Sequence, residues 1–134
     1  MGAVLGFDYG IRKIGVAVGQ TITRTATPLR TLPTRDEKPD WDAIGQLIRE
    51  WQPESLVVGL PYQMDDVEAP VAERARRFAR QLEGRYRLPV FLADERLTTR
   101  EAKRQLGREA RRDALRVDAM AARLILETWL CDRD

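Results

Sequence analysis

Three short segments with strand-like patterns, the first of them an apolar run, make up the first third of the chain. They cover residues 3–8, 13–19 and 24–32. Runs of this length, the third one rich in β-branched residues, are typical of strands. Pro28 in the third run suits an edge strand, because a proline nitrogen cannot donate a hydrogen bond to a neighbouring strand. The short connections predict that the three strands form an antiparallel meander.

The middle of the chain alternates between helical and strand patterns. Apolar residues recur at helical spacing over residues 42–51, after the candidate N-cap Asp40 and before Pro53, which would end the helix. Uninterrupted apolar runs follow at residues 56–60 and 89–93. Such runs are typical of strands buried on both faces, and they predict that these two strands are parallel.

Helical patterns follow each of the two buried strands. After the first, an apolar stripe predicts a helix that ends near Gly84. After the second, Thr98 with an acid three residues later forms a capping-box pattern, which predicts a helix over residues 98–108. A mobile segment is expected at residues 107–113, before a last helix over residues 117–130. The stripe of the first helix consists of Val71, Ala75, Phe78, Ala79 and Leu82.

Together these elements predict an α/β protein with helices packed on a mixed five-stranded sheet. The first three strands of this sheet are expected to be antiparallel and the last two parallel. The length of 134 residues, 43% of them hydrophobic, fits one domain over residues 1–134 with one core.

The composition excludes several classes of function. The chain has no histidine, so His-based general catalysis, Ser-His-Asp triads and His-ligated zinc are excluded. A single cysteine, Cys131, excludes an internal disulfide framework and fits a reducing compartment. The apolar runs are too short to cross a bilayer, and no apolar stretch follows the N-terminus. We therefore expect a cytoplasmic protein with no membrane partner.

Basic charge is concentrated in one part of a chain whose net charge is only +2. Residues 71–116 contain 14 Arg or Lys against 7 Asp or Glu. Within this segment, Arg100, Arg104, Arg108 and Arg111 fall on one helical face. Twenty of the 23 basic residues are arginine, which suits bidentate phosphate contacts but is equally explained by codon bias. The clustering predicts a nucleic-acid-binding face, with a solvated surface as the alternative.

Three acids from distant parts of the chain are expected to converge. Asp8 ends an apolar strand, and Glu95 follows another, so both lie at the carboxyl edge of the sheet, where ligand sites collect in α/β folds. Asp118 shares the apolar face of the last helix and is expected to point toward the sheet. The simpler alternatives are that Asp8 accepts hydrogen bonds from turn amides, that Glu95 is solvated and that Asp118 caps a helix.

A cluster of carboxylates without histidine is the kind of site that Mg²⁺ or Mn²⁺ prefers. Two such ions, about 3.5–4 Å apart, can activate a water and stabilise the leaving oxygen in phosphodiester cleavage. This chemistry requires no histidine, so it agrees with the composition.

The motifs resemble the YqgF/RuvX family of the ribonuclease H-like superfamily. Members of this family are described as Holliday junction resolvases and as nucleases that mature the 5′ end of pre-16S ribosomal RNA. The resemblance covers nearly the whole chain and implies a ribonuclease H-like fold with helices on both faces of the sheet. The matching blocks are GFDYGIRKIGVAVGQ, DWDAIGQLIREWQPESLVVGLP, RARRFA, LADERLTTREA and VDAMAARLILETWL.

Carried over by position, the family's acidic triad falls on Asp8, Glu95 and Asp118, which are the acids already singled out. The resemblance also implies roles in nucleic-acid binding for residues beside the first two acids. These residues are Arg12, Lys13, Arg96, Thr98 and Thr99. It further implies functional roles for Gly59 and Pro61, at the corner where a strand passes into a loop.

The sequence departs from the family pattern at two places. Family members often have glycine after Met-Asp in the loop that follows the VGLP corner, whereas this chain has Met64-Asp65-Asp66, which alters the expected loop conformation. Where the family commonly has lysine two residues before the last acid, this chain has Arg116, which can face phosphate but stays charged and is less suited to proton transfer.

The leading hypothesis is a metal-dependent endonuclease that acts on structured nucleic acid. The three acids would hold two Mg²⁺ or Mn²⁺ ions, and arginines would contact phosphates. The substrate would be a four-way DNA junction, pre-16S rRNA or both, and junction cleavage would favour a homodimer. The arginines expected to contact phosphates are Arg12, Arg96, Arg100, Arg104 and Arg116.

Two other classes remain open. The first is a non-catalytic RNA-binding or ribosome-assembly factor that uses the basic face alone. The second is a nucleotide-binding protein, since the spacing Asp8-x-Gly10-x-x-x-x-Gly15 also resembles the phosphate-binding turn of the actin and heat-shock-protein ATPase superfamily. The length argues against the second class, because those proteins enclose the nucleotide between two such domains.

Overall fold

The computed structural model describes residues 2–60, 69–94 and 114–131. Side chains are described throughout these ranges except at residues 60, 69–71, 94, 114–118 and 120. The elements in chain order are β1 (Ala3–Asp8), β2 (Lys13–Gln20), β3 (Thr25–Pro33), α1 (Trp41–Trp51), β4 (Ser55–Leu60), α2 (Ala69–Tyr86), β5 (Val90–Asp94) and α4 (Ala114–Cys131).

The five strands form one mixed sheet in the order β3-β2-β1-β4-β5. β1 pairs antiparallel with β2, which in turn pairs antiparallel with β3. β4 lies parallel to β1 on its other side, and β5 lies parallel to β4. The predicted sheet is therefore confirmed, and β3, with Pro28, is an edge strand as expected.

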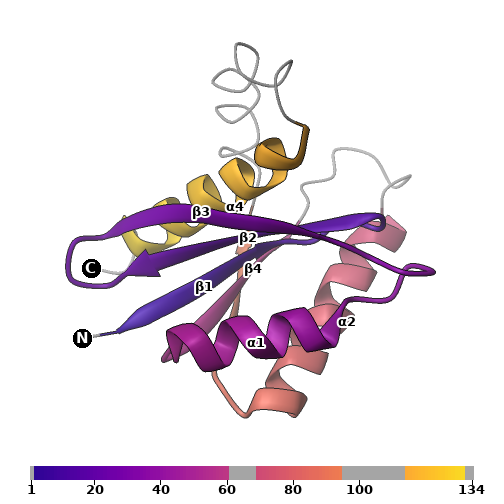
Figure 1. Cartoon of the computed structure of the whole chain (residues 1–134), viewed down its shortest axis with the longest axis horizontal. Helices are drawn as coiled ribbons and strands as arrows, with labels where there is room; N and C mark the ends of the chain where they lie inside the picture. Colours follow the sequence, from indigo (N-terminus) through magenta and orange to yellow (C-terminus); the bar gives the residue numbers. More distant parts are fainter. Residues whose placement is uncertain (1, 61–68, 95–113, 132–134) are drawn as a thin grey trace.

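Helices cover both faces of the sheet, which confirms the predicted layering (Figure 1). α1 and α2 pack on one face, where the sheet presents large side chains such as Leu5, Phe7 and Val58. Phe7 meets Phe78 of α2 edge-on, with 5.6 Å between ring centroids. Burial of large apolar groups on this face supplies the main driving force for folding.

α4 packs on the opposite face, where the sheet presents small residues. Gly6 and Gly19 lie directly under Leu126, and Ala17 belongs to the same buried cluster. A Cβ atom at Gly19 would come within 2.9 Å of side-chain atoms of Leu126 and Leu130. The small residues thus allow α4 to approach the strands closely.

The sequence predicted the N-cap of α1 correctly but placed the end of α2 too early. Asp40 caps α1 as predicted, its Oδ1 accepting a hydrogen bond from the Ala43 N–H at 3.1 Å. The prediction that α2 ends near Gly84 is wrong, because the helix continues to Tyr86. Arg87 then adopts a left-handed φ of 55° and donates its N–H to the Glu83 carbonyl oxygen.

Several predicted features lie outside the described residues. They are the helix at 98–108, the segment 107–113 and the loop around Met64-Asp65-Asp66. Among the helices that are described, none is long and apolar enough to cross a membrane.

Candidate active site

The candidate site is built around Asp8, the last residue of the central strand β1. Val4 packs against α4, and Gly6 lies under it. Because side chains alternate between the faces of a strand, Asp8 lies on the α4 face as well. Its position at the carboxyl edge of a parallel pair is where α/β sheets bind ligands.

Asp8 is flanked on both sides by glycine. The register places Gly15 of β2 and Gly59 of β4 directly opposite it. The same row across the sheet continues to Thr31 of β3 and Ala93 of β5. Asp8 therefore has the only ionisable side chain in a row of five small residues. The Asp8 carboxylate is half-buried, and the strand residues paired with it carry no side chain.

The start of α4 lies toward the same end of the sheet. Leu126 packs over Gly6, and Leu130 packs with it over Gly19, which pairs with the beginning of β1. α4 therefore runs opposite to β1, and its first turns approach the carboxyl end of that strand (Figure 1). The backbone of Asp118 belongs to these first turns, one turn before the fully buried Ala122. The Asp118 side chain is not among those described.

The third predicted acid lies outside the described residues. Glu95 directly follows Asp94, the last residue of β5. Two residues before Glu95, Ala93 stands in the same row as Asp8. Of the three predicted carboxylates, the structure thus describes the side chain of Asp8 alone.

Two of the predicted basic residues are described beside Asp8. Arg12 is exposed in the turn between β1 and β2, and Lys13 is the half-buried first residue of β2. Lys13 stands two residues before Gly15 and therefore shares the face of Asp8, at a diagonal spacing of about 7–8 Å. The other predicted contacts, Arg96, Thr98, Thr99, Arg100 and Arg104, lie outside the described residues, and Arg116 is placed by its backbone alone in α4.

The turn that carries Arg12 is fastened to the end of β3. The Thr34 N–H donates to the Arg12 carbonyl oxygen at 2.9 Å, and the Thr34 hydroxyl donates to the Ile11 carbonyl oxygen at 2.6 Å. These bonds fix the backbone of the turn, so the basic side chains extend from a defined position next to Asp8.

Tyr9 follows Asp8, but its side chain packs on the opposite face of the sheet. Its ring lies 5.3 Å from that of Phe78 in the core under α2. Burial raises the pKa of the Tyr9 hydroxyl, and the nearby Arg74 opposes this effect. Trp41 likewise stacks on Phe78, with the Arg85 guanidinium 4.2 Å from its ring centroid. Both aromatic residues are packing residues.

The donor chemistry of the row suits a hard divalent cation. Carboxylate oxygens are the ligands that Mg²⁺ or Mn²⁺ prefers, and Asp8 supplies such a group at the carboxyl edge of the sheet. The described part of the chain contains no cluster of three or more potential metal ligands. The assignment of Asp8, Glu95 and Asp118 as metal ligands therefore stays a prediction.

Sequence reasoning did not identify the row of small residues around Asp8. The sequence contains Gly15 and Gly59, but only the pairing register of β2, β1 and β4 shows that both lie opposite Asp8. The alternation of small residues at Gly15, Ala17 and Gly19 was the one available signal, since it indicates a strand face that is closely approached.

The fold and the site define a class of protein. A mixed sheet of three antiparallel and two parallel strands, with helices on both faces, is a ribonuclease H-like architecture. Two solved structures share it. Thermus thermophilus RuvC in complex with a Holliday junction substrate has a TM-score of 0.63 at 18% identity, covering 99% of this chain and 96% of that one. The fowlpox virus resolvase in complex with Holliday junction DNA has a TM-score of 0.55 at 8% identity, with 96% of both chains covered.

The family follows from sequence comparison. A family model described as "RuvX: Holliday junction resolvase" matches residues 2–132, and the chain belongs to this family. A relative from Azotobacter vinelandii, named "Putative pre-16S rRNA nuclease", is 53% identical over 97% of this chain and 94% of its own length. A relative of the same name from Methylococcus capsulatus is 52% identical over 93% of this chain and 85% of its own length. The predicted family is therefore confirmed.

Proposed function

We propose that this protein is a divalent-metal-dependent endonuclease that hydrolyses phosphodiester bonds in structured nucleic acid. The observation that carries the proposal is the position of Asp8, an acid at the carboxyl edge of the parallel strands with glycine on both sides. The family description and the relatives' names, which all denote nucleases, support it.

Three acids would hold the metal in this proposal. Asp8 supplies one ligand from β1, Asp118 a second from the start of α4, and Glu95 a third from the segment after β5. Bound Mg²⁺ or Mn²⁺, two ions in this proposal, would polarise the phosphate, activate water and stabilise the leaving oxygen. The chain itself holds the phosphate backbone through Arg12 and Lys13 on the Asp8 side.

The substrate we propose is the 5′ end of pre-16S rRNA, with a four-way DNA junction as the second candidate. The relatives at about half identity are named for the first, and the family model is described for the second. Junction cleavage requires two symmetrically placed cuts, so it would need a two-fold dimer of this chain. The exposed, free Cys131 supports a reducing compartment, which we propose to be the cytoplasm.

The test is a cleavage assay with both substrates in parallel. Labelled precursor 16S rRNA and a labelled four-way junction are incubated with the protein and Mg²⁺ or Mn²⁺, and with a chelator as control. We expect cleavage of the precursor RNA that the chelator abolishes. Binding without cleavage in either metal would instead indicate a non-catalytic RNA-binding factor. Micromolar binding of ATP in calorimetry, with no cleavage, would indicate a nucleotide-binding protein.

A further inference from the structure

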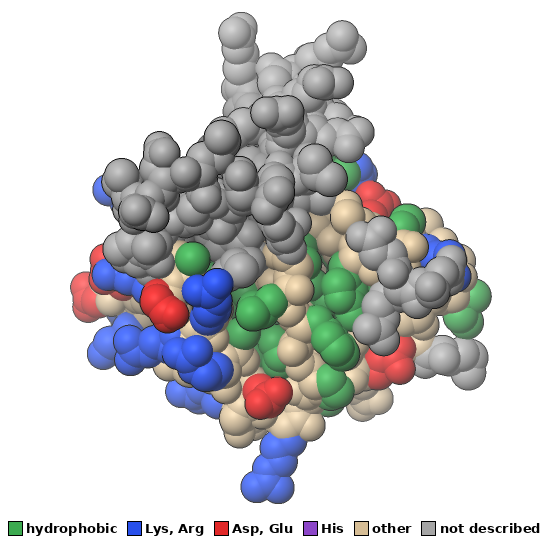
Figure 2. Space-filling model, turned by 180° about the vertical axis from the view of Figure 1, so that it is seen from behind, with side chains coloured by type: hydrophobic (Ala, Val, Ile, Leu, Met, Phe, Trp, Pro, Cys, Tyr) green, Lys and Arg blue, Asp and Glu red, His purple; other side chains and the backbone are tan. Residues whose placement is uncertain are grey.

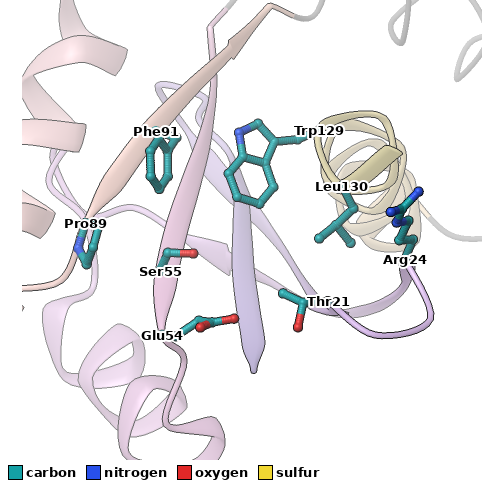
Figure 3. A pocket seen from close by; sticks show the side chains of 8 residues that line it. All are labelled: Thr21, Arg24, Glu54, Ser55, Pro89, Phe91, Trp129 and Leu130. Atoms are coloured by element: carbon teal, nitrogen blue, oxygen red, sulfur yellow. The ribbon is translucent and has the colours of Figure 1, made fainter. Parts of the chain in front are cut away.

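A cavity of about 440 Å³ opens at the other end of the sheet from Asp8. One of its walls is aromatic. Trp129 of α4 and Phe91 of β5 lie 5.2 Å apart with their rings inclined by 39°. Both rings border the opening in Figure 3. Both rings are half-buried and pack against the apolar cluster under α4. Nucleic-acid bases stack on aromatic side chains that border an opening in this way.

The opposite side of the cavity is polar. Glu54 and Ser55, at the start of β4, both project toward the space below Trp129 (Figure 3). The Glu54 carboxylate lies across Gly2, occupying the place that a Cβ atom there would take. The backbone of Glu54 is fixed by a hydrogen bond from its N–H to the Ala3 carbonyl oxygen at 2.9 Å. The absence of a side chain at Gly2 therefore lets the Glu54 carboxylate lie at the edge of the cavity.

The chain around Gly2 is itself fastened to the turn after β2. The Thr21 hydroxyl accepts a hydrogen bond from the Gly2 N–H at 3.1 Å and donates one to the Gly2 carbonyl oxygen at 3.2 Å. The same turn carries Arg24, which has a left-handed φ of 58° and donates its N–H to the Gln20 carbonyl oxygen. The Arg24 side chain stands beside Leu130 at the rim of the cavity (Figure 3).

An aromatic platform, a carboxylate and a guanidinium suit a guanosine nucleotide. A carboxylate accepts two hydrogen bonds, and guanine offers two adjacent donors, N1–H and N2–H, on its Watson–Crick edge. Adenine presents an acceptor at N1, which a carboxylate repels. The guanidinium is suited to a phosphate, which it can bind in a bidentate manner.

The cavity shares a sheet face with the candidate active site. Ser55 pairs with Val4, and Gly59 pairs with Asp8 four residues further along β4. At about 3.3 Å per residue, the two sites are roughly 13 Å apart along the strand. α4 lies mainly over β1, β2 and β3, so it does not cover the β4–β5 side between them. A few nucleotides of an extended strand can span this distance.

The surface seen from behind agrees with a nucleic-acid contact. Figure 2 shows hydrophobic side chains exposed in the middle of the described surface, with a group of Lys and Arg side chains to one side. An apolar area beside a basic one suits a single strand, because bases stack on apolar side chains while the backbone follows positive charge.

We propose that this cavity binds a guanosine of the substrate strand a few nucleotides from the cut, and so sets the cleavage position. The base stacks on Trp129, its Watson–Crick edge meets Glu54, and its phosphate meets Arg24. This inference rests on the proposed nuclease function, because it assigns the guanosine to the strand that is cut.

The first test measures nucleotide binding without any cleavage. The full-length protein is titrated with GMP, IMP and AMP by calorimetry and by quenching of tryptophan fluorescence. We expect GMP to bind at least about tenfold more tightly than AMP, since a good bidentate contact discriminates by that factor or more. IMP, which lacks the N2 amino group, should fall between them.

The Glu54→Gln variant tests the assigned contact. A glutamine amide can pair with adenine, so this variant should lose about tenfold in GMP affinity and reverse the preference toward AMP. Glu50→Gln on the exposed surface of α1 removes the same charge away from the cavity and should change neither value. Equal affinity for GMP and AMP, or a preference that survives Glu54→Gln, would overturn the proposal.

The second test moves a single guanosine along a labelled precursor RNA. In the wild-type protein the cut should move with the guanosine, and in Glu54→Gln it should not. If GMP binds selectively but the cut ignores the guanosine, the cavity serves a free nucleotide and the proposal is wrong. If no RNA is cut although GMP binds selectively, the nuclease assignment fails while the guanine site stands.

Discussion

Gly19→Ala adds one methyl group at the contact between β2 and α4. The new Cβ would lie 2.9 Å from Leu126 Cδ2 and Leu130 Cδ1, and 3.0 Å from Leu126 Cγ. Carbon atoms in contact prefer about 3.5–4.0 Å, so either the leucines must leave their positions or α4 must move outward. Overpacking of this kind costs about 1–3 kcal/mol of the free energy of unfolding.

The assay is urea denaturation followed by circular dichroism, with Gly84→Ala as the matched control. Gly84 lies inside α2, and a Cβ atom there would meet nothing within 4 Å. The same chemical change should therefore stabilise the protein at this position, by about 0.5–1 kcal/mol, because alanine is the better helix former. The two variants are expected to differ in sign.

A double-mutant cycle with Leu126→Ala identifies the contact responsible. Leu126 is fully buried, and its truncation alone should cost about 2–5 kcal/mol. In the double variant the methyl group added at position 19 enters the space left by the leucine, so the combined loss should be smaller than the sum by about 0.5–3 kcal/mol. Gly19→Ala with wild-type stability, or strictly additive losses, would refute the close packing of α4.

Two smaller predictions concern helix capping and alkaline pH. Asp40→Ala removes the acceptor for the Ala43 N–H and should lower the free energy of unfolding by about 1 kcal/mol in urea denaturation, whereas Asp40→Asn should stay within a few tenths. Burial raises the pKa of both Tyr9 and Tyr86 above 10.0, so the unfolded chain releases these protons first and stability should fall as pH rises beyond 10. The Tyr9→Phe/Tyr86→Phe double variant should show a shallower fall in alkaline denaturation, and an unchanged slope would contradict this assignment.

The central strands β1 and β4 were predictable because their apolar runs are nearly uninterrupted and their ends are marked by turns. β1 spans residues 3–8, as the apolar run predicted. The end of α2 was not predictable, because an exposed glycine costs a helix only about 1 kcal/mol. Tyr86, one turn beyond the fully buried Leu82, extends the helix by packing against Trp41, and this tertiary contact outweighs the local signal.

The candidate site was predictable only in part. Asp8 stood out because a charged residue ends an apolar strand, but its two glycine neighbours are known only from the pairing register. The cavity between Glu54 and Trp129 could not be predicted, since these residues come from distant segments and neither belongs to a periodic pattern that points to a ligand. Local sequence identifies elements and strand ends, whereas register and packing determine which side chains meet.

The most direct test of the proposed nuclease compares cleavage and binding in Asp8→Asn. This variant keeps the shape of the side chain but removes the charge that a cation requires, while the basic residues that supply the affinity for phosphate remain. Asp42→Asn, on the exposed surface of α1, is the matched control. With precursor 16S rRNA and a four-way junction in Mg²⁺ or Mn²⁺, we expect Asp8→Asn to lower the cleavage rate by about 100-fold or more with binding changed by less than a few-fold. Equal cleavage by Asp8→Asn and the wild-type protein would contradict the assignment of Asp8 to the active site.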